Sequence, residues 1–279
     1  MMKRLVLFVC LLAFLPLRGQ ERIKALFGAR APEGMTELSW TVDGVRRTAL
    51  VASPAGSAAT PGPVVFGWHG HFGNSAHSAK SWDIARLWPE ATFVFPQGLR
   101  TATPLVDKGG LGSGWQSSVG AEGDRDIKFF DAMLADLKKQ RRVDERKVYS
   151  MGHSNGAAFS YVLWQARPRA LAAVGSVAGT LTVKARDMDP MPVIHVAGEK
   201  DPIVKYAWQQ MTFAAVRRFN GCGEEGTPWA KEGVLEATLY ASSKGAPLVT
   251  AVHSGGHEYA KGSSELIIRF FKERAAGVR

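Results

Sequence analysis

The sequence predicts an α/β fold, a mostly parallel central sheet flanked by helices on both faces. Short apolar runs recur along the chain, and they are apolar on successive residues, as in strands buried on both faces. Helical patterns lie between these runs, and strands that alternate with helices form parallel sheets. With 279 residues, of which 46% are hydrophobic, the chain is long enough for one large core.

The N-terminal segment has the pattern of a secretory signal. A basic start precedes an apolar run over residues 5–15, which is too short to span a bilayer. We interpret residues 1–19 as a signal peptide and residues 20–279 as a single domain, secreted or periplasmic and free of the membrane after cleavage. An uncleaved membrane anchor is the alternative, because Leu17 is larger than the residue usually found three positions before a cleavage site.

Cysteine content and charge narrow the classes of function. Without the signal peptide Cys222 is the only cysteine, so the exported protein has no internal disulfide. The formal net charge is +10, but basic residues are scattered among acidic ones, without the basic runs and interleaved aromatics of a nucleic-acid surface. We therefore expect no nucleic-acid partner. The sequence does not determine the oligomeric state.

The elements can be assigned in chain order. Asp43-Gly44 is a two-residue turn signal, so residues 36–40 and 47–52 are predicted to form a β-hairpin. Buried strands are predicted over residues 64–68, 92–95, 147–151, 171–177, 193–197 and 248–252. Helices are predicted over residues 126–140, 154–166, 203–219 and 264–273.

Two local features complete this assignment. Asp124 is the predicted N-cap of the helix over residues 126–140. Basic residues lie at the C-terminal end of this helix, where the helix dipole stabilises positive charge. Residues 109–114 are rich in glycine but lack the spacing and the strand-to-helix setting of a phosphate-binding loop. We predict that they form a mobile surface loop.

One motif on this framework carries chemistry. The strand over residues 147–151 runs into Gly152-His153-Ser154-Asn155-Gly156 and then into a helix, which is the setting of a nucleophile elbow. In that motif a serine lies on a tight strand-to-helix turn, and the flanking glycines let the backbone approach closely. Three fixed positions can coincide by chance, but the strand and the helix around them favour a true elbow. Ser154 is therefore the predicted nucleophile.

A serine nucleophile requires a histidine base, and the base requires a carboxylate that holds it in the correct tautomer. In this fold the order along the chain is serine, acid, histidine. Asp201 directly follows the strand over residues 193–197 and is the predicted acid. Glu199 is the alternative acid, and a helix N-cap before Pro202 is the structural role that Asp201 could have instead.

Two histidines follow Asp201 in the sequence and could be the base. His253 lies at the end of an apolar run, where a packed histidine is expected. His257 follows Ser254-Gly255-Gly256 in a loop that is free to reach the serine. His257 is therefore the predicted base.

Two N–H donors must bind the negative oxygen that develops during attack on an ester carbonyl. Asn155, the residue after the nucleophile, is expected to supply the first. Gly70 or His71 is expected to supply the second from the loop after the third strand, the one that begins at Val64. His69 and His71, with His77 nearby, could instead bind a metal, but no cysteine or carboxylate accompanies them. We expect no metal, and we expect His69 to brace the loop.

Six segments of the chain together resemble one family: Trp68-His69-Gly70, Gly114-Trp115, residues 124–137, 143–149 and 152–156, and Gly255-Gly256-His257. The family is the secreted polyhydroxybutyrate depolymerase, feruloyl esterase and acetylxylan esterase group of α/β-hydrolases. The likeness runs from about residue 64 to the end of the chain. It implies that residues 20–279 form one α/β-hydrolase catalytic domain.

The resemblance also implies roles for residues. It implies Ser154, Asp201 and His257 as a triad, with no metal and no organic cofactor. It places Trp115 near the acyl or leaving-group pocket, where we also place His69, although Trp115 could be a loop anchor in the core. This chain departs from the family after its last Gly-Gly-His, where it lacks the frequent Trp-Pro, and it lacks most of the cysteines that often accompany these sites.

The sequence thus predicts a secreted serine carboxylic-ester hydrolase that forms an acyl-enzyme and acts on feruloyl or acetyl esters of plant-wall polysaccharide. Trp115, Trp68 and Trp82 near the proposed mouth would suit stacking on an aromatic acid or a sugar. Depolymerisation of polyhydroxybutyrate oligomers is the alternative reaction. A noncatalytic cell-envelope binding protein on the same fold is the alternative of another class, because fold does not fix function.

Overall fold

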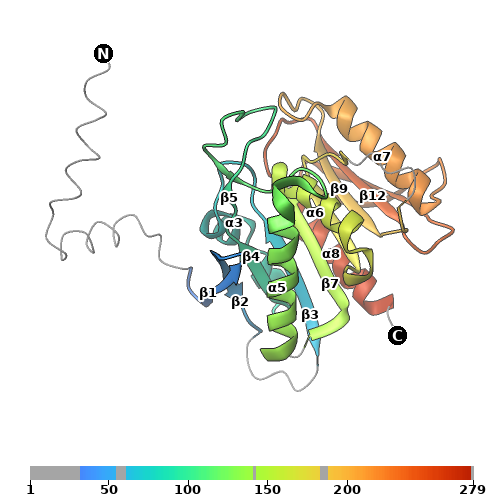
Figure 1. Ribbon diagram of the computed structural model, residues 1–279. Coiled ribbons are helices and arrows are strands. Elements are labelled where there is room, and N and C mark those ends of the chain that lie inside the picture. The colour runs from blue at the N-terminus through green and yellow to red at the C-terminus, as the bar shows by residue number, and fades with distance from the viewer. Residues whose placement is uncertain (1–31, 55–60, 141–142, 183–187, 278–279) are drawn as a thin grey trace, which may run out of the picture. The chain divides into compact units, whose positions relative to one another are not determined.

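A computed structural model describes residues 32–54, 61–140, 143–182 and 188–277 (Figure 1). One compact unit runs from Gly34 to the C-terminal end. The predicted signal peptide, residues 1–19, lies outside the described residues. None of the described helices combines the length and the apolar character that a membrane span needs.

The described strands form a ten-stranded central sheet in the order β1-β2-β4-β3-β7-β8-β9-β12-β11-β10. Their bounds are β1 (Met35–Val42), β2 (Val45–Ala52), β3 (Gly62–Trp68), β4 (Thr92–Pro96), β7 (Val143–His153), β8 (Ala173–Val177), β9 (Val193–Gly198), β10 (Thr227–Glu232), β11 (Leu235–Tyr240) and β12 (Leu248–His253). Neighbours from β4 to β12 pair in parallel, and antiparallel pairs lie at the two edges. The predicted mostly parallel sheet is confirmed.

The six predicted buried strands are present as β3, β4, β7, β8, β9 and β12. Nearly every residue of β3, β4, β8 and β9 is buried, which explains why their sequences are apolar on successive residues and do not alternate. The predicted hairpin is also confirmed, since β1 pairs with β2 around Asp43 and Gly44, both at positive φ.

Helices pack against this sheet, and α5 and α6 lie in front of its central strands in Figure 1. The described helices are α3 (Ser75–Trp82), α4 (Ile84–Leu87), α5 (Arg125–Gln140), α6 (Asn155–Ala166), α7 (Tyr206–Asn220) and α8 (Ser263–Gly277), with short 3₁₀ turns η2 (Ala121–Asp124) and η3 (Pro168–Ala170). Helix α6 contacts β3, β7 and β8, and α7 contacts β9 and β12. The four predicted helices correspond to α5, α6, α7 and α8.

The start of α5 differs from the prediction. The carboxylate of Asp124 does not cap this helix, because it accepts hydrogen bonds from the Gly120 amide and the Gln116 side chain. The side-chain oxygen of Gln116 caps it instead, at 3.0 Å from the Asp126 amide and 3.4 Å from the Ile127 amide. The N-terminal amides of α5 are thus capped by Gln116, which is more distant in the sequence than the predicted cap, Asp124.

The end of the segment 109–114 also differs from the predicted surface loop, whereas Gly109 and Leu111 are exposed. Ser113–Gly114 forms strand β6, which pairs with β5 (Leu99–Arg100), and Gly112 and Gly114 are buried. A Cβ atom on Gly114 would lie 2.6 Å from Nδ1 of His71 and 2.8 Å from Oδ1 of Asn155. The end of this segment is therefore packed against two residues of the predicted site.

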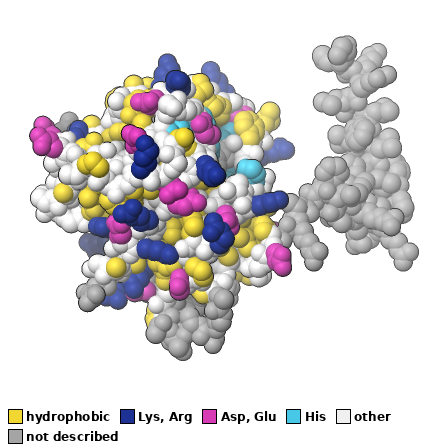
Figure 2. Space-filling model, turned by 180° about the vertical axis from the view of Figure 1, so that it is seen from behind, with side chains coloured by type: hydrophobic (Ala, Val, Ile, Leu, Met, Phe, Trp, Pro, Cys, Tyr) yellow, Lys and Arg dark blue, Asp and Glu magenta, His cyan; other side chains and the backbone are white. Residues whose placement is uncertain are grey.

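The arrangement places the chemistry at one edge of the sheet. The parallel strands β3, β7, β9 and β12 all end at the same edge, and the segments that follow them hold the predicted site residues. On the face seen in Figure 2, basic and acidic side chains are interspersed among hydrophobic ones, and histidine side chains reach the surface in its upper part.

Candidate active site

Ser154 occupies a strained turn between β7 and α6. Its φ and ψ are 55° and −119°, and a positive φ is unfavourable for a residue with a Cβ atom. The turn is held on both sides, because the Ser154 amide donates to the carbonyl of Val177 (2.8 Å) and the Ser154 carbonyl accepts from the Ala158 amide (3.0 Å). The backbone of a nucleophile elbow is therefore present.

The two glycines of the motif are required by close backbone approach. A Cβ atom on Gly156 would lie 2.1 Å from the carbonyl oxygen of Trp68, and one on Gly152 would lie 2.4 Å from the carbonyl carbon of Gly156. Both distances are far below van der Waals contact. The turn can form only because these positions lack a side chain.

Hydrogen bonds join the three residues of the predicted triad. Nε2 of His257 lies 2.8 Å from Oγ of Ser154, and Nδ1 of His257 lies 2.7 Å from Oδ2 of Asp201. Since a carboxylate only accepts, Nδ1 carries the proton and Nε2 is free to accept from the serine hydroxyl. The geometry is that of a nucleophile, a base and an orienting acid.

Asp201 is buried and its carboxylate is held by several donors. Oδ1 accepts from the amides of Ile203 (2.9 Å) and Val204 (2.8 Å), and Oδ2 accepts from His257 and from the side chain of Gln209 (3.3 Å). The side chain has no exposed surface. The predicted alternative role as an N-cap is partly present as well, since these amides belong to the turn before α7.

The alternative residues for the acid and the base lie elsewhere. Glu199 is exposed, and its backbone rather than its carboxylate contacts the neighbouring strand end. His253 is buried in β12, and its Nδ1 accepts from the Gly255 amide (3.1 Å). This is the packed position that the apolar run predicted.

Asn155 and Gly70 are both close to Ser154. The Asn155 amide is at the first position of α6, where no intrahelical acceptor uses it. A Cβ atom on Gly70 would lie 3.5 Å from Cβ of Ser154, so this backbone passes directly beside the nucleophile. The Asn155 side chain forms two hydrogen bonds with the backbone of Trp115: it accepts from the amide (2.7 Å) and donates to the carbonyl (3.1 Å).

At the start of the loop after β3, His69 forms two hydrogen bonds to backbone groups. Its Nε2 accepts from the Gly98 amide (3.0 Å), which leaves the proton on Nδ1 to donate to the carbonyl of Gly70 (2.8 Å). Burial lowers the pKa of His69 to about 4, so the ring is neutral near neutral pH. A neutral ring in one tautomer fixes the orientation of the Gly70 peptide beside Ser154.

Asp107 is a residue of the site that the sequence did not reveal. Its Oδ2 accepts from Nε2 of His71 (3.0 Å) and from the Gly112 amide (2.7 Å), and both side chains are almost fully buried. The Gly112 amide and the His71 ring together hold the pKa of Asp107 at about 2. The pair connects the loop that carries His71 to the segment before β6, and the two residues are 36 positions apart in the sequence.

Trp115 and Trp68 lie in the core and not at a mouth. Both side chains are fully buried and pack edge to face at 4.9 Å, and each also contacts Phe159. The indole N–H of Trp115 donates to the carbonyl of His69 (2.8 Å), and that of Trp68 donates to Oγ of Ser150 (2.9 Å). Trp115 thus has the alternative role of a loop anchor, and stacking of Trp68 on a ligand is excluded by burial.

A pocket of about 370 Å³ lies beside Gly70 and His153, both of which adjoin Ser154. Its lining is His69, Gly70, His71, Gly73, His77, Ser78, Ser81, Trp82, His153 and Tyr259. Trp82 stacks on Tyr259 with ring centroids 4.9 Å apart, so it is the one tryptophan of the predicted three that borders a pocket. His153 donates from Nε2 to the carbonyl of His257 (2.8 Å), and burial lowers its pKa to about 4.

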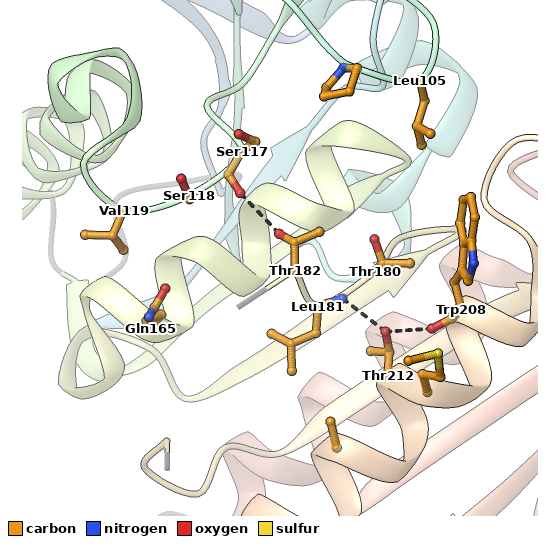
Figure 3. Close-up of a pocket in the computed structure, with 13 residues that line it drawn as sticks. Leu105, Ser117, Ser118, Val119, Gln165, Thr180, Leu181, Thr182, Trp208 and Thr212 are labelled. Atoms are coloured by element: carbon orange, nitrogen blue, oxygen red, sulfur yellow. Dashed lines mark hydrogen bonds between the residues drawn. The ribbon is translucent and has the colours of Figure 1, made fainter. Parts of the chain in front are cut away.

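A larger apolar cleft of about 950 Å³ lies against α7 and the segment after β8 (Figure 3). It is lined by Pro104, Leu105, Ser117, Ser118, Val119, Gln165, Thr180, Leu181, Thr182, Trp208, Met211, Thr212 and Ala215. Four of these side chains are exposed apolar groups: Leu105 (60%), Val119 (44%), Trp208 (37%) and Met211 (70%). Exposed apolar side chains that gather around a cleft indicate a ligand surface.

Some residues that line this cleft are close, along the chain, to residues that form hydrogen bonds with the site. Thr180 follows Val177, whose carbonyl accepts from the Ser154 amide. Ser117 follows Trp115, which the side chain of Asn155 holds. Trp208 precedes Gln209, which donates to Asp201. The segments that line the cleft therefore include neighbours, along the chain, of residues that contact the triad, while the cleft itself is lined by other side chains.

Within the described residues, no group of three or more His, Cys, Asp or Glu side chains is placed to hold a metal ion. The rings of His69 and His71 point to separate partners, a peptide and a carboxylate. Cys222 is a half-buried free thiol far along the chain from these residues, beside α7.

Comparison with known proteins relates the chain to esterases, although no family model matches it. It is 25% identical over 215 residues to a probable feruloyl esterase C of Aspergillus niger, covering 73% of each chain. It is 26% identical to feruloyl esterase C of Emericella nidulans, over 72% of each chain. A shorter match to the putative esterase NocK of Nocardia uniformis has 32% identity and spans 30% of that protein.

Solved structures give the fold. Acetyl xylan esterase from Aspergillus awamori superposes with a TM-score of 0.65 at 15% identity, covering 85% of this chain and 99% of that one. A carboxylesterase from Bacillus cereus has a TM-score of 0.57 at 15% identity, over 87% and 96% of the two chains. The chain is thus similar in sequence to esterases, and it has the fold of solved esterases. In parallel sheets of this kind ligands bind at the edge formed by the carboxyl ends of the strands, which is the edge that carries Ser154.

Proposed function

We propose that this α/β-hydrolase is a secreted serine carboxylic-ester hydrolase that acts through an acyl-enzyme. The observation that carries the proposal is the hydrogen-bonded series Ser154–His257–Asp201 on a strained elbow, with distances of 2.8 and 2.7 Å. The Ser154 hydroxyl has a histidine base within hydrogen-bonding distance. Its strained backbone conformation persists because the surrounding structure holds it in place. The relatedness to esterases agrees with it.

In the proposed first step Oγ of Ser154 attacks the ester carbonyl carbon while Nε2 of His257 takes the hydroxyl proton. Asp201 accepts from Nδ1 of His257 and stabilises the imidazolium that forms. The amide of Asn155 and the amide of Gly70 or His71 bind the oxyanion. Collapse of the tetrahedral intermediate breaks the bond to the leaving alkoxide, which takes the proton from Nε2.

In the second step a water molecule attacks the acyl-enzyme. His257 takes one proton from this water, and the tetrahedral intermediate then expels Oγ of Ser154, which regains its proton from the imidazolium. The products are the carboxylic acid and the alcohol of the ester, and the enzyme returns to its starting protonation state. Neither step needs a group beyond the side chains and amides already named.

The proposed substrates are feruloyl or acetyl esters of plant-wall polysaccharide. Relatives named feruloyl esterase and acetyl xylan esterase favour this class over polyhydroxybutyrate oligomers. The apolar cleft favours a bulky acyl group over acetyl, since a volume of about 950 Å³ far exceeds what two carbons fill. The histidine and serine side chains that line the pocket of about 370 Å³ suit a hydroxyl-rich alcohol.

Two further parts of the proposal rest on sequence. We place the protein outside the cytoplasm, secreted or periplasmic, from the pattern of residues 1–19. We assign no metal or organic cofactor to the reaction, because the proposed steps are complete without one.

A fluorophosphonate probe tests whether Ser154 is activated. We expect covalent labelling of the folded protein at Ser154, located by mass spectrometry of the labelled peptide, and no labelling after heat denaturation. Rates on methyl ferulate, acetylated xylan and hydroxybutyrate oligomers, measured side by side, then identify the ester. A folded protein that is neither labelled nor active on any of the three would favour the noncatalytic binding protein.

The apolar cleft gives a prediction about specificity. Trp208→Ala and Met211→Ala are expected to lower the ratio of kcat/KM on an aryl or octanoyl ester to kcat/KM on an acetyl ester by about tenfold each, as expected for a lost apolar contact worth ~1.4 kcal/mol. Because the ratio compares two esters on the same variant, a change in the hydrolytic residues that affects both esters equally leaves the ratio unchanged. Val234→Ala, on the exposed turn between β10 and β11, is the control and should leave the ratio unchanged. An unchanged ratio in both cleft variants would remove the cleft from the site.

A further inference from the structure

Hydrogen bonds continue from Asp201 into the core through three side chains that the proposed reaction does not use. Nε2 of Gln209 on α7 lies 3.3 Å from Oδ2 of Asp201, and Oε1 of Gln209 lies 3.1 Å from Nε2 of His195 on β9. Nδ1 of His195 lies 2.7 Å from the hydroxyl of Tyr161 on α6. Gln209 and His195 have no exposed surface, and Tyr161 is 1% exposed.

The direction of each hydrogen bond in this series is determined. Nε2 of Gln209 also donates to the carbonyl of Val204 (2.8 Å), so the amide nitrogen must face Asp201 and Val204 and the amide oxygen must face His195. Oε1 only accepts, so His195 carries its proton on Nε2. Its Nδ1 is then an acceptor, and the Tyr161 hydroxyl donates to it. Every donor in the series points toward the carboxylate of Asp201.

Burial keeps the series in this one state. It lowers the pKa of His195 to about 4, so the ring is neutral and holds a single proton near neutral pH. It raises the pKa of the Tyr161 hydroxyl, so that group stays protonated and remains a donor. In a buried, low-dielectric setting each hydrogen bond polarises the next, which strengthens the last one at the carboxylate.

We propose that Gln209, His195 and Tyr161 are positioning residues that orient Asp201 and, through it, His257; this rests on the proposed function. The two amides on Oδ1 hold one carboxylate oxygen, and Gln209 is the donor besides His257 that the structure places on the other. Without Gln209 the Oδ2 atom loses its fixed place opposite Nδ1 of His257. The series links α6, β9 and α7, so the packing of three elements determines the orientation of the base.

Gln209→Leu and Tyr161→Phe test this proposal. Leucine keeps most of the volume of Gln209 and removes all of its hydrogen bonds, so kcat is expected to fall about tenfold with KM unchanged, the loss expected when a hydrogen bond to a charged group is removed. Phenylalanine removes only the last hydroxyl, so a smaller fall of about threefold is expected. Tyr149→Phe is the matched control, because the Tyr149 hydroxyl is equally buried but has no hydrogen-bond partner in the described structure.

A spectroscopic measurement separates positioning from general destabilisation. The proton on Nδ1 of His257, shared with Asp201, should give a downfield ¹H NMR signal in the wild type and in Tyr149→Phe, and this signal should shift upfield or broaden in Gln209→Leu and Tyr161→Phe. Thermal unfolding identifies any variant that does not fold. If Gln209→Leu does not fold, Tyr161→Phe carries the test.

The outcomes are distinct. Wild-type kcat and an unmoved signal in folded Gln209→Leu and Tyr161→Phe would overturn the proposal, and so would an equal loss in Tyr149→Phe. A rise in KM without a change in kcat would also overturn it, because positioning of the base acts on the chemical step. If the wild type hydrolyses no ester, the proposed function fails, whereas the response of the signal still decides whether the series orients Asp201.

Discussion

Alanine at position 154 is expected to lower the rate of ester hydrolysis by about three to six orders of magnitude, with KM nearly unchanged. The loss is large because the covalent step disappears, while the proposed oxyanion donors and the binding surfaces remain. Hydrolysis of p-nitrophenyl acetate measures the rate, and fluorophosphonate labelling should be lost in the same variant. The fold should persist, because the Ser154 side chain makes one hydrogen bond, to His257.

Ser254→Ala is the control for this prediction. Ser254 is an exposed serine near His257, and its replacement should leave the rate at the wild-type level. Turnover of the ester by Ser154→Ala at a rate close to that of the wild type would show that another group attacks the carbonyl, and the proposed mechanism would have to be abandoned.

Gly156→Ala is expected to have the second-largest effect. The new Cβ atom would lie 2.1 Å from the carbonyl oxygen of Trp68 and 2.5 Å from that of His69, and both are backbone atoms that cannot rotate away. The loop after β3 and the elbow must therefore separate, which displaces the Asn155 amide from the Ser154 site. A misplacement of about 1 Å is expected to lower kcat about 100-fold or more.

The same substitution should destabilise the fold by roughly 1–3 kcal/mol, because it overpacks a closely packed turn. This is opposite to the intrinsic preference, since alanine is the better helix former and Gly156 lies in the first turn of α6. Urea unfolding measures the change. Gly223→Ala is the control, because the nearest atom to its Cβ would be 3.9 Å away; an equal effect in both variants would contradict the steric argument.

Local patterns explain why much of the fold could be predicted. The strand β7, the motif around Ser154 and the helix α6 are contiguous, so their apolar periodicity and their glycines are visible in one stretch of sequence. The hairpin β10–β11 was missed, because β10 has no buried residue and the alternation in β11 is limited to buried Leu235 and Ala237 around exposed Glu236. The cap of α5 was misassigned because Gln116, nine residues before the helix, is its actual partner.

The site shows the same division. The placement of Asp201 and His257 beside Ser154 could be expected from the order of residues after parallel strands, since these strands all end at one edge of the sheet. Trp115 and Trp68 were expected near the mouth of the site but are buried. The sequence around a tryptophan does not show whether its ring is buried or exposed. Trp208, which does line the cleft, lies on a helix whose sequence carries no motif.

By itself the sequence determined the Gly-x-Ser-x-Gly motif between a strand and a helix, and the alternation of strands and helices, because each depends on residues near one another along the chain. Only the tertiary structure decided that Asp107 binds His71, that Gln209, His195 and Tyr161 form a hydrogen-bonded series ending at Asp201, and that Trp208 and Met211 line an apolar cleft. These features depend on burial and on contacts between distant segments. Such contacts form when the sheet brings the segments together, and no local pattern records them.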